Sequence, residues 1–332
     1  MKSAASRRVE SYKQENGRNN RGRRLPECPG DSMNEPIKHH YIPQFILRQF
    51  CFGGKESLLF YDKNSNAISK KSTKDVFMVP DLYRDEINHA DDPAKTERDF
   101  AKFEGEMAGI IKNRFLDKQD IVISREENEA LKFFLALMGL RSKNASEAFG
   151  EKASPTAKRF YARYGSLPDY WQQNLGYLVN CRSLHEVLAH PSLDPEIKVF
   201  MRRDVEGYFE RYLAVVECRE PDEFVISDAY PTVITGMRPD GIPLEMYSIC
   251  PLSSKRAVFL CCIGVKNTPR EALKMRECIF SEPSLLDEQR IKIRVRKLYQ
   301  EETGLINREV IKNARTGVAF RTENAKKYFA ET

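Results

Sequence analysis

Apolar side chains recur with helical spacing in the middle of the chain. Over residues 96–115 they fall three and four positions apart, at Phe100, Phe103, Met107, Ile110 and Ile111. This period is that of a helix with one face against a core. Glu104 lies on the same face, between Phe100 and Met107. We therefore expect a helix that carries one charged group on its apolar side, where the charge needs a partner.

A second helix is expected to begin at Ser124. Ser124 and Glu127 form the S-x-x-E pattern of a capping box, in which each side chain bonds the other residue's backbone N–H. From residue 131 to residue 140 the sequence LKFFLALMGL is apolar almost all round, which is typical of a central, buried helix. Arg141 ends this run, again as a charge beside apolar residues.

The pattern becomes extended in the second half of the chain. Short segments rich in Val, Ile, Phe and Tyr, separated by Pro, Gly and Asp, predict an antiparallel sheet: RYLAVVECR, EFVISD, MYSICPLSS and KRAVFLCCI. Residues 145–210 before them, and QRIKIRVRKLYQEE and NREVIKNA after them, are interpreted as helices. Helices, then strands, then helices indicate an α+β fold, predominantly helical with a small antiparallel sheet.

The segment KHHYIPQFILRQF places two histidines next to a short apolar run. The residue before Pro43 is driven into extended geometry, and Pro43 itself suits the first turn of a helix over PQFILRQF. Gln44 and Arg48, four residues apart, share one side of that helix. The following SLLFYDKNSNAISKKS reads as a β-hairpin that turns near residues 63–66.

Charge divides the chain into an amino-terminal tail and a body. Residues 1–32 hold eight Lys and Arg against four Asp and Glu, so they supply +4 of the net charge of +6. The tail has few apolar residues and is predicted to be disordered. It is either a basic arm for nucleic acid as a partner or a flexible appendage before Met33. Residues 33–332 are expected to form a single α+β domain, whose near-neutral charge gives little support for a nucleic-acid groove.

Several classes of protein are disfavoured by what the sequence lacks. No run of about 18 apolar residues and no secretory signal occur, so we expect no membrane partner and a cytoplasmic location. The eight cysteines form no C-x-x-C pair, which favours reduced, mostly buried thiols. Walker, dinucleotide-binding, H-E-x-x-H and G-x-S-x-G motifs are absent. Cofactor, metal and substrate therefore stay unassigned.

The text HHYIPQFILRQF resembles HHYVPQFYLRNF, the hallmark of a bacterial family catalogued as domain-of-unknown-function family 4238. Further matches follow in order: YDK at 61–63, KDVFMVPDLY, the acidic residue Glu104, the apolar helix that ends at Arg141, EFVISD, PLSS at 251–254 and NREVIKNA. The family continues its strand with SD-x-P, whereas here the proline after Ser227 and Asp228 comes one residue later, at Pro231. The resemblance implies a fold and a region for the site, without an activity.

The candidate site residues are polar or charged groups next to apolar text: His39, His40, Gln44, Arg48, Glu104, Arg141, Ser227 and Asp228. Adjacent side chains of an extended segment point to opposite faces, so at most one histidine should enter a shared pocket. Glu104 and Arg141 would cost several kcal/mol each if buried without an opposite charge, so they are expected to pair with each other, or Glu104 is expected to pair with Arg48. Ser227 and Asp228 also suit a turn or cap.

Two functions from different classes remain open. The first is a hydrolase, such as a nuclease, with a histidine as general base or metal ligand, Asp228 or Glu104 as the carboxylate, and Arg48 or Arg141 stabilising an anion. The second is a non-catalytic binding module, in which the polar cluster holds the amino-terminal segment against the helices. An open cleft with a histidine and Asp228 would favour the enzyme, and a sealed Glu104 and Arg141 network would favour the module.

Overall fold

The structure is a computed structural model that describes residues 38–53, 56–86, 89–141, 174–193, 195, 198, 211–237, 243–261 and 283–329. The tail predicted for residues 1–32 and most of the helices predicted for residues 145–210 lie outside the described residues. Five cysteines lie within them, all as free thiols: Cys51, Cys181, Cys218, Cys250 and Cys261. All but Cys51 are buried, as the sequence predicted.

Strands contribute far more to the fold than the sequence predicted. In the described part of the chain, thirteen strands form three sheets of two, seven and four strands. The prediction of a mainly helical fold with one small antiparallel sheet is therefore wrong, and the fold is mixed α/β. The physical reason is that most of the missed strands pair with partners 80 or more residues away, so the sequence around each strand does not reveal it.

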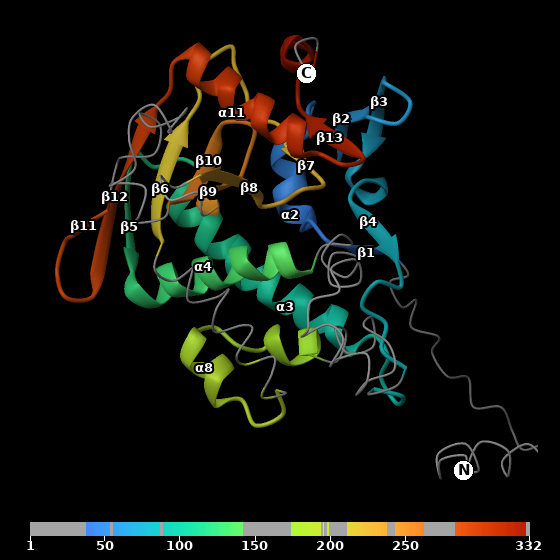
Figure 1. The fold of residues 1–332 in the computed structure, drawn as a ribbon, viewed down its shortest axis with the longest axis vertical. Helices are drawn as coiled ribbons and strands as arrows, with labels where there is room; N and C mark the ends of the chain where they lie inside the picture. Colours follow the sequence, from blue (N-terminus) through green and yellow to red (C-terminus); the bar gives the residue numbers. More distant parts are fainter. Residues whose placement is uncertain are drawn as a thin grey trace, which may run out of the picture. The chain divides into compact units, whose positions relative to one another are not determined.

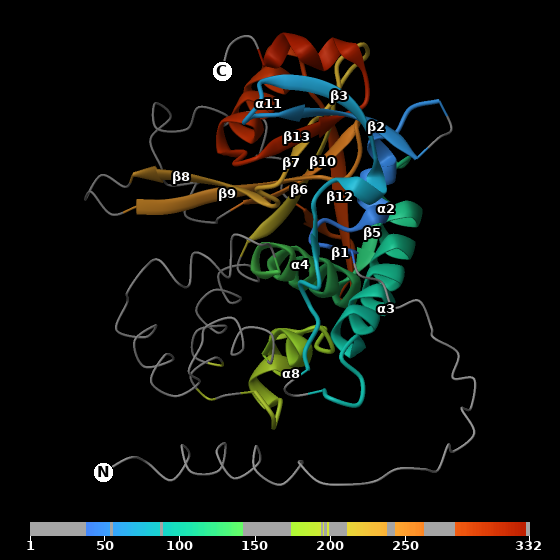
Figure 2. The same cartoon turned by 90° about the vertical axis from the view of Figure 1, so that its right-hand side faces the viewer.

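The seven-stranded sheet is covered on both faces (Figures 1 and 2). Four of its strands form an antiparallel set: β6 (Tyr212–Glu217), β10 (Arg256–Cys261), β9 (Pro243–Pro251) and β8 (Thr232–Met237). The sequence predicted β6, β9 and β10 but not β8, and the fourth predicted segment, EFVISD, contains a strand of another sheet, β7 (Ile226–Ser227). Val215 and Val258 belong to one core cluster with the helices α3 and α4, while Val216 and Phe259 belong to a second with α11. Neighbouring residues of a strand face opposite sides of the sheet. Both faces of these strands pack against a core, so the residues on both faces are apolar.

Strand β12 (Arg290–Lys297) is the largest local error of the sequence prediction, which made it a helix. Its text RIKIRVRK alternates basic and β-branched residues with the period of two that a strand requires. β12 pairs with β5 (Asp120–Ser124) over Arg290–Arg294 and then, in parallel, with β6 over Val295–Lys297. Its partner thus changes between Arg294 and Val295. The two-residue β11 (Ser284–Leu285) also pairs with β12.

The four-stranded sheet joins segments from distant parts of the chain. Its order is β3 (Ala67–Ser72), β2 (Ser57–Asp62), β13 (Gly317–Phe320) and β7 (Ile226–Ser227). The predicted hairpin is the β2–β3 pair. A side chain at Gly317 is excluded, because a Cβ there would lie 2.1 Å from a ring carbon of Phe60 on β2.

Helices cover the seven-stranded sheet from two sides (Figure 2). On one side lie α3 (Lys95–Ile110), which ends in a π-helical turn over Ile111–Phe115, and α4 (Arg125–Leu140). α4 begins with the predicted capping box of Ser124 and Glu127 and is buried from Leu131 to Met138. On the other side lies α11 (Gln300–Asn313). The short α8 (Leu184–Ala189) is a further helix of the described part of the chain.

The amino-terminal segment lies against the helical side of the structure. β1 (Lys38–His40) pairs with β4 (Met78–Pro80), and Pro43 precedes the short α2 (Gln44–Leu47), which continues as one 3-10 turn to Phe50. Ile42, Ile46, Leu47 and Phe50 are fully buried in the core that also holds α3 and α4. The expected extended stretch and short helix are both present.

Candidate functional site

The two histidines of the amino-terminal motif point into different surroundings. His39 is buried, and its Nδ1 accepts a hydrogen bond of 2.9 Å from the backbone N–H of Tyr83. The imidazole also stacks on the Tyr83 ring, with 5.5 Å between centroids and an angle of 2° between planes. His39 therefore fixes the loop between β4 and α3 to β1.

His40 begins a chain of polar contacts that leads to the surface. Its Nε2 lies 3.0 Å from the carbonyl oxygen of Thr73, which can only accept, so Nε2 carries the proton. Nδ1 then accepts from the Gln44 amide at 3.3 Å, Gln44 Oε1 accepts from Arg48, and Arg48 pairs with Glu56 at 2.9 Å. Burial lowers the pKa of His40, so the imidazole stays neutral.

Arg141 is the centre of the cluster. Its side chain is 1% exposed and follows the last residue of α4. Nη1 lies 2.5 Å from Glu104 Oε1, Nε donates to the Tyr83 hydroxyl at 3.0 Å, and Nη2 donates to the carbonyl oxygen of His40. The guanidinium carbon lies 4.3 Å from the centre of the Phe100 ring. Burial acts to lower the pKa of Arg141, but the neighbouring Tyr83 and Glu104 outweigh it, so the arginine stays charged.

Glu97 is a member of the cluster that the sequence analysis missed. Burial raises the pKa of this carboxyl from 4.5 to about 8, although Arg141 acts in the opposite direction. Oε2 of Glu97 is buried and has no hydrogen-bond partner in the described part of the chain, and neither has Oγ1 of the adjacent Thr96. Glu97 is seven residues before Glu104, so both lie on one helix face, and this spacing was the available signal.

Asp228 serves a separate part of the fold. Its Oδ1 accepts from the backbone N–H of Arg315 at 2.9 Å, and Oδ2 accepts from the N–H and hydroxyl of Thr316 at 2.8 and 2.7 Å. The carboxylate thus holds the turn between α11 and β13. Ser227 Oγ, in β7, is buried and has no hydrogen-bond partner among the described residues. The bond between Tyr230 and Pro231, where the motif departs from the family pattern, is cis.

The structure groups some of the predicted site residues and separates others. The Arg141 cluster unites His39, His40, Tyr83, Glu97, Glu104 and Arg141. Among the described residues, Gln44 and Arg48 connect to it through His40. Asp228 shares no hydrogen bond or ion pair with either histidine among the described residues. No group of three or more His, Cys, Asp or Glu that could hold a metal ion occurs in the ranges that the structure describes.

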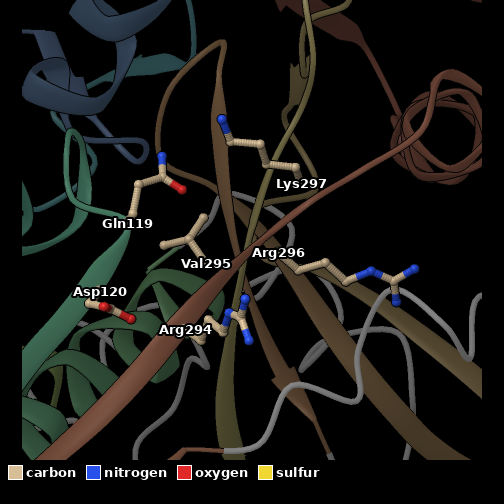
Figure 3. A pocket seen from close by; sticks show the side chains of 6 residues that line it. All are labelled: Gln119, Asp120, Arg294, Val295, Arg296 and Lys297. Carbon is tan, nitrogen blue, oxygen red and sulfur yellow. The ribbon is translucent and has the colours of Figure 1, made fainter.

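Two adjoining cavities lie away from this cluster, around the end of β12. The first, of about 560 Å³, is shown in Figure 3 and is lined by Gln119, Asp120, Arg294, Val295, Arg296 and Lys297. The second, of about 620 Å³, is lined by Leu116, Asp117, Gln119, Glu217, Cys218, Arg219, Glu220, Lys255, Arg256 and Lys297. Gln119 and Lys297 line both, and no residue of the Arg141 cluster lines either.

The comparison with known proteins decides the family. The model of the family described as "Protein of unknown function (DUF4238)" matches residues 38–324. The chain belongs to the DUF4238 family. The resemblance predicted from HHYIPQFILRQF is thereby confirmed. No curated protein and no solved structure matches the chain.

In this DUF4238 chain the matched region begins with β1 and includes the whole Arg141 cluster and both cavities. The described helices include none that is long and apolar enough to cross a membrane. The cytoplasmic location and the role of each predicted site residue stay predictions. For the cavities, the alternation of basic residues in RIKIRVRK was the signal that the sequence offered.

Proposed function

We propose that this DUF4238 chain is a non-catalytic binding module, in which the Arg141 cluster fastens the amino-terminal segment Lys38–Phe50 to the helical core. The observation that supports it most is the set of contacts of Arg141. One buried guanidinium bonds Glu104 of α3, Tyr83 of the loop after β4 and the carbonyl of His40 in β1. Three segments distant in sequence therefore depend on one side chain.

The bonding of the histidines also supports a positioning role. A general base needs a ring nitrogen whose lone pair can reach a substrate proton. In His39 the accepting Nδ1 is occupied by the Tyr83 amide. In His40 both nitrogens are engaged, by the Thr73 carbonyl and by Gln44. Asp228, the carboxylate expected to act with them, uses both oxygens to hold residues 315–316.

The test compares stability with activity in His39→Ala and His40→Ala. Each variant loses buried hydrogen bonds worth about 1–3 kcal/mol, so each should melt several degrees below the wild type in thermal unfolding followed by circular dichroism. His185→Ala, an exposed histidine of α8, is the matched control and should keep the wild-type Tm. Hydrolysis of an ester or phosphodiester by the wild type that is lost in a normally stable His39 or His40 variant would contradict the proposal.

A hydrolase, such as a nuclease, is the second candidate, and Glu97 favours it. A carboxylic acid that stays protonated near pH 7, beside a charged arginine and with one oxygen unbonded among the described residues, has the properties of a general acid. Glu97 would donate the proton, and the other roles would fall to the residues expected from the sequence: His39 or His40, Glu104 or Asp228, and Arg48 or Arg141.

Glu97→Gln separates the two candidates, because an amide keeps the shape of the neutral acid but cannot donate an acid proton. A broad ester and phosphodiester screen, with and without Mg²⁺, Mn²⁺ or Zn²⁺, is run on the wild type and this variant. Glu106→Gln, on the same helix and paired with Arg182 at the surface, is the control. Turnover by the wild type and the control that Glu97→Gln lacks, at an unchanged Tm, would support the enzyme. Equal absence of turnover supports the module.

A further inference from the structure

The two cavities at the end of β12 adjoin each other, and we call them together the β12 groove. It lies where β12 leaves β5 and joins β6, between Arg294 and Val295. The shared residues Gln119 and Lys297 connect its halves. In Figure 3 the side chains of Arg294 and Lys297 come from β12. Asp120 is the first residue of β5, and Gln119 is the residue before it.

Most carboxylates around the β12 groove are already paired with a cation of the protein. Glu217 holds the buried Arg256 at 2.5 Å. Glu220 lies 2.7 Å from Lys255. Asp120 lies 3.3 Å from Lys292. These ion pairs neutralise the acidic side chains of the groove. The small net charge of the chain's body therefore does not show how positive the groove itself is.

Three exposed cations of the groove have no hydrogen-bonded carboxylate in the part of the chain that the structure describes. The side chain of Arg294 makes no hydrogen bond or ion pair within the described ranges. Lys297 is 55% exposed and lies 3.7 Å from Glu217, which Arg256 already occupies. Arg219 is exposed and has a ring as its partner, the side chain of Tyr299, instead of a carboxylate. All three are able to meet an external anion.

An exposed aromatic ring, that of Tyr299, lines neither cavity but contacts Arg219, which lines one of them. Tyr299 follows β12, is 57% exposed, and its ring centre lies 4.6 Å from the guanidinium carbon of Arg219. The arginine holds the ring by a cation–π contact and leaves the rest of its surface in solvent. Flat aromatic rings beside cations are the surfaces on which proteins stack unpaired bases.

We propose that the β12 groove binds single-stranded nucleic acid, with Arg219, Arg294 and Lys297 on successive phosphates and Tyr299 against a base. The combination of a basic groove that follows the backbone and an aromatic platform matches how single strands are bound without sequence preference. A duplex does not present unpaired bases to such a ring. This inference rests on the proposed binding function and names the ligand of that function.

The experiment measures binding of a fluorescein-labelled 20-residue oligothymidylate to the full chain by anisotropy, from 50 to 200 mM salt. The groove variant combines Arg219→Gln, Arg294→Gln and Lys297→Gln. Its matched control, Lys38→Gln with Arg98→Gln and Lys326→Gln, removes three cations that already form surface ion pairs elsewhere. Each phosphate contact in a single strand contributes about 0.7 to the slope of log K against log salt. The groove variant should therefore lose about 2 from that slope, and the control should keep it.

Equal slopes in the groove variant and the control would overturn the proposal, because the contacts would then lie elsewhere, for example in residues 1–32. Absence of binding by the wild type at 50 mM salt would overturn it as well. Tyr299→Ala should weaken binding about ten-fold at an unchanged slope, and Tyr299→Phe should restore it. If Tyr299→Ala binds as tightly as the wild type, the ring does not stack on a base. The argument for single strands over duplex then fails.

A competition with inorganic phosphate and thymidine monophosphate separates a polymer from a small ligand. Displacement of the oligonucleotide only at concentrations far above its own Kd supports the polymer, and displacement at an equal concentration overturns it. The result is independent of the histidine variants. If those variants merely melt lower while the oligonucleotide does not bind, the ligand is wrong and the binding module stands. If one of them loses an enzymatic activity, the module itself fails.

Discussion

Two buried arginines of this DUF4238 chain have nearly the same immediate bonding and opposite surroundings. Arg141 is 1% exposed and lies 2.5 Å from Glu104, and Arg256 is 2% exposed and lies 2.5 Å from Glu217. Both also donate to backbone carbonyls, Arg141 to His40 and Arg256 to Phe115 at 2.5 Å. Each thus ties a helix end to a distant segment.

The difference lies beyond these first contacts. Around Arg141 the space is filled by the rings of Tyr83 and Phe100 and by the neutral acid Glu97. Arg256 instead lines the β12 groove, next to the exposed Lys297. A buried ion pair is therefore not by itself a sign of a site. The two pairs are equally exposed, so what separates them is the groove. We call the Arg256 region, which lines the groove, open, and the Arg141 region, which neither cavity reaches, sealed.

The sharpest test of the sealed pair is Glu104→Ala. It leaves Arg141 buried without its closest carboxylate, so it should lower the free energy of unfolding by about 3–5 kcal/mol, measured by urea denaturation at pH 7. Glu106→Ala, on the same helix, removes a surface pair and should change it by less than about 1 kcal/mol. A loss as small as the control's would show that Arg141 is solvated, and the contrast with Arg256 would disappear.

The pH dependence of stability tests the neutral acid in the sealed region. The pKa of Glu97 is about 8 in the folded chain and near 4.5 when unfolded, so the folded state binds more protons between these values. Stability should consequently fall as the pH rises from 4.5 to 8, by about 3 kcal/mol after allowing for partial exposure. Glu97→Gln cannot titrate and should lose this part of the pH dependence in urea titrations. Parallel curves for variant and wild type would show that Glu97 is ionised throughout.

The corresponding change in the open region is Glu217→Ala. Arg256 loses two hydrogen bonds, of 3.0 and 2.5 Å, but Glu217 lines the groove, so water can enter the space that its side chain leaves. The expected loss is about 2 kcal/mol, the value of a hydrogen bond to a charged group. The same urea measurement as for Glu104→Ala gives a direct comparison. A larger loss than in Glu104→Ala would reverse the assignment of sealed and open regions.

The smallest effect is expected from removing residues 1–32, which the sequence predicts to be a disordered tail. A chain that begins at Met33 should melt within about 2 °C of the full chain, because the removed residues have too few apolar side chains to dock. Differential scanning calorimetry of both chains checks this. A drop of 5 °C or more would mean that the tail packs and supports one of the two arginine regions.

The sequence predicted those elements whose information is local. The capping box at Ser124 and the apolar run after it predicted α4, and turn residues between two apolar segments predicted the β2–β3 hairpin. The charge of Arg141 next to that run predicted a need for a partner, and Glu104 is that partner. The capping box and the hairpin are short local patterns, whereas Glu104 and Arg141 are 37 residues apart and were linked only through the cost of burying each charge alone.

The rest depended on long-range pairing. β12 was predicted to be a helix, since Lys, Arg and Gln favour helices. Its alternating sequence also allows a strand, and its pairing with β5 and β6 selects the strand. Glu97 was missed because its pKa reflects burial by the whole fold. The β12 groove was missed because its cations and their carboxylates come from separate segments, and the net charge of the chain's body averages over them.

The position of β13 has a consequence for folding during synthesis. β13 lies between β2 and β7, about 255 residues after β2 along the chain. At about 5–20 residues per second, the β2–β3 hairpin emerges about 13–50 s before the strand that covers its edge. During that interval β2 offers unpaired backbone groups and the side chain of Phe60 to any neighbouring strand. A nascent chain is therefore expected to need a chaperone, or slow translation in polysomes, more than the stability of the finished sheet suggests.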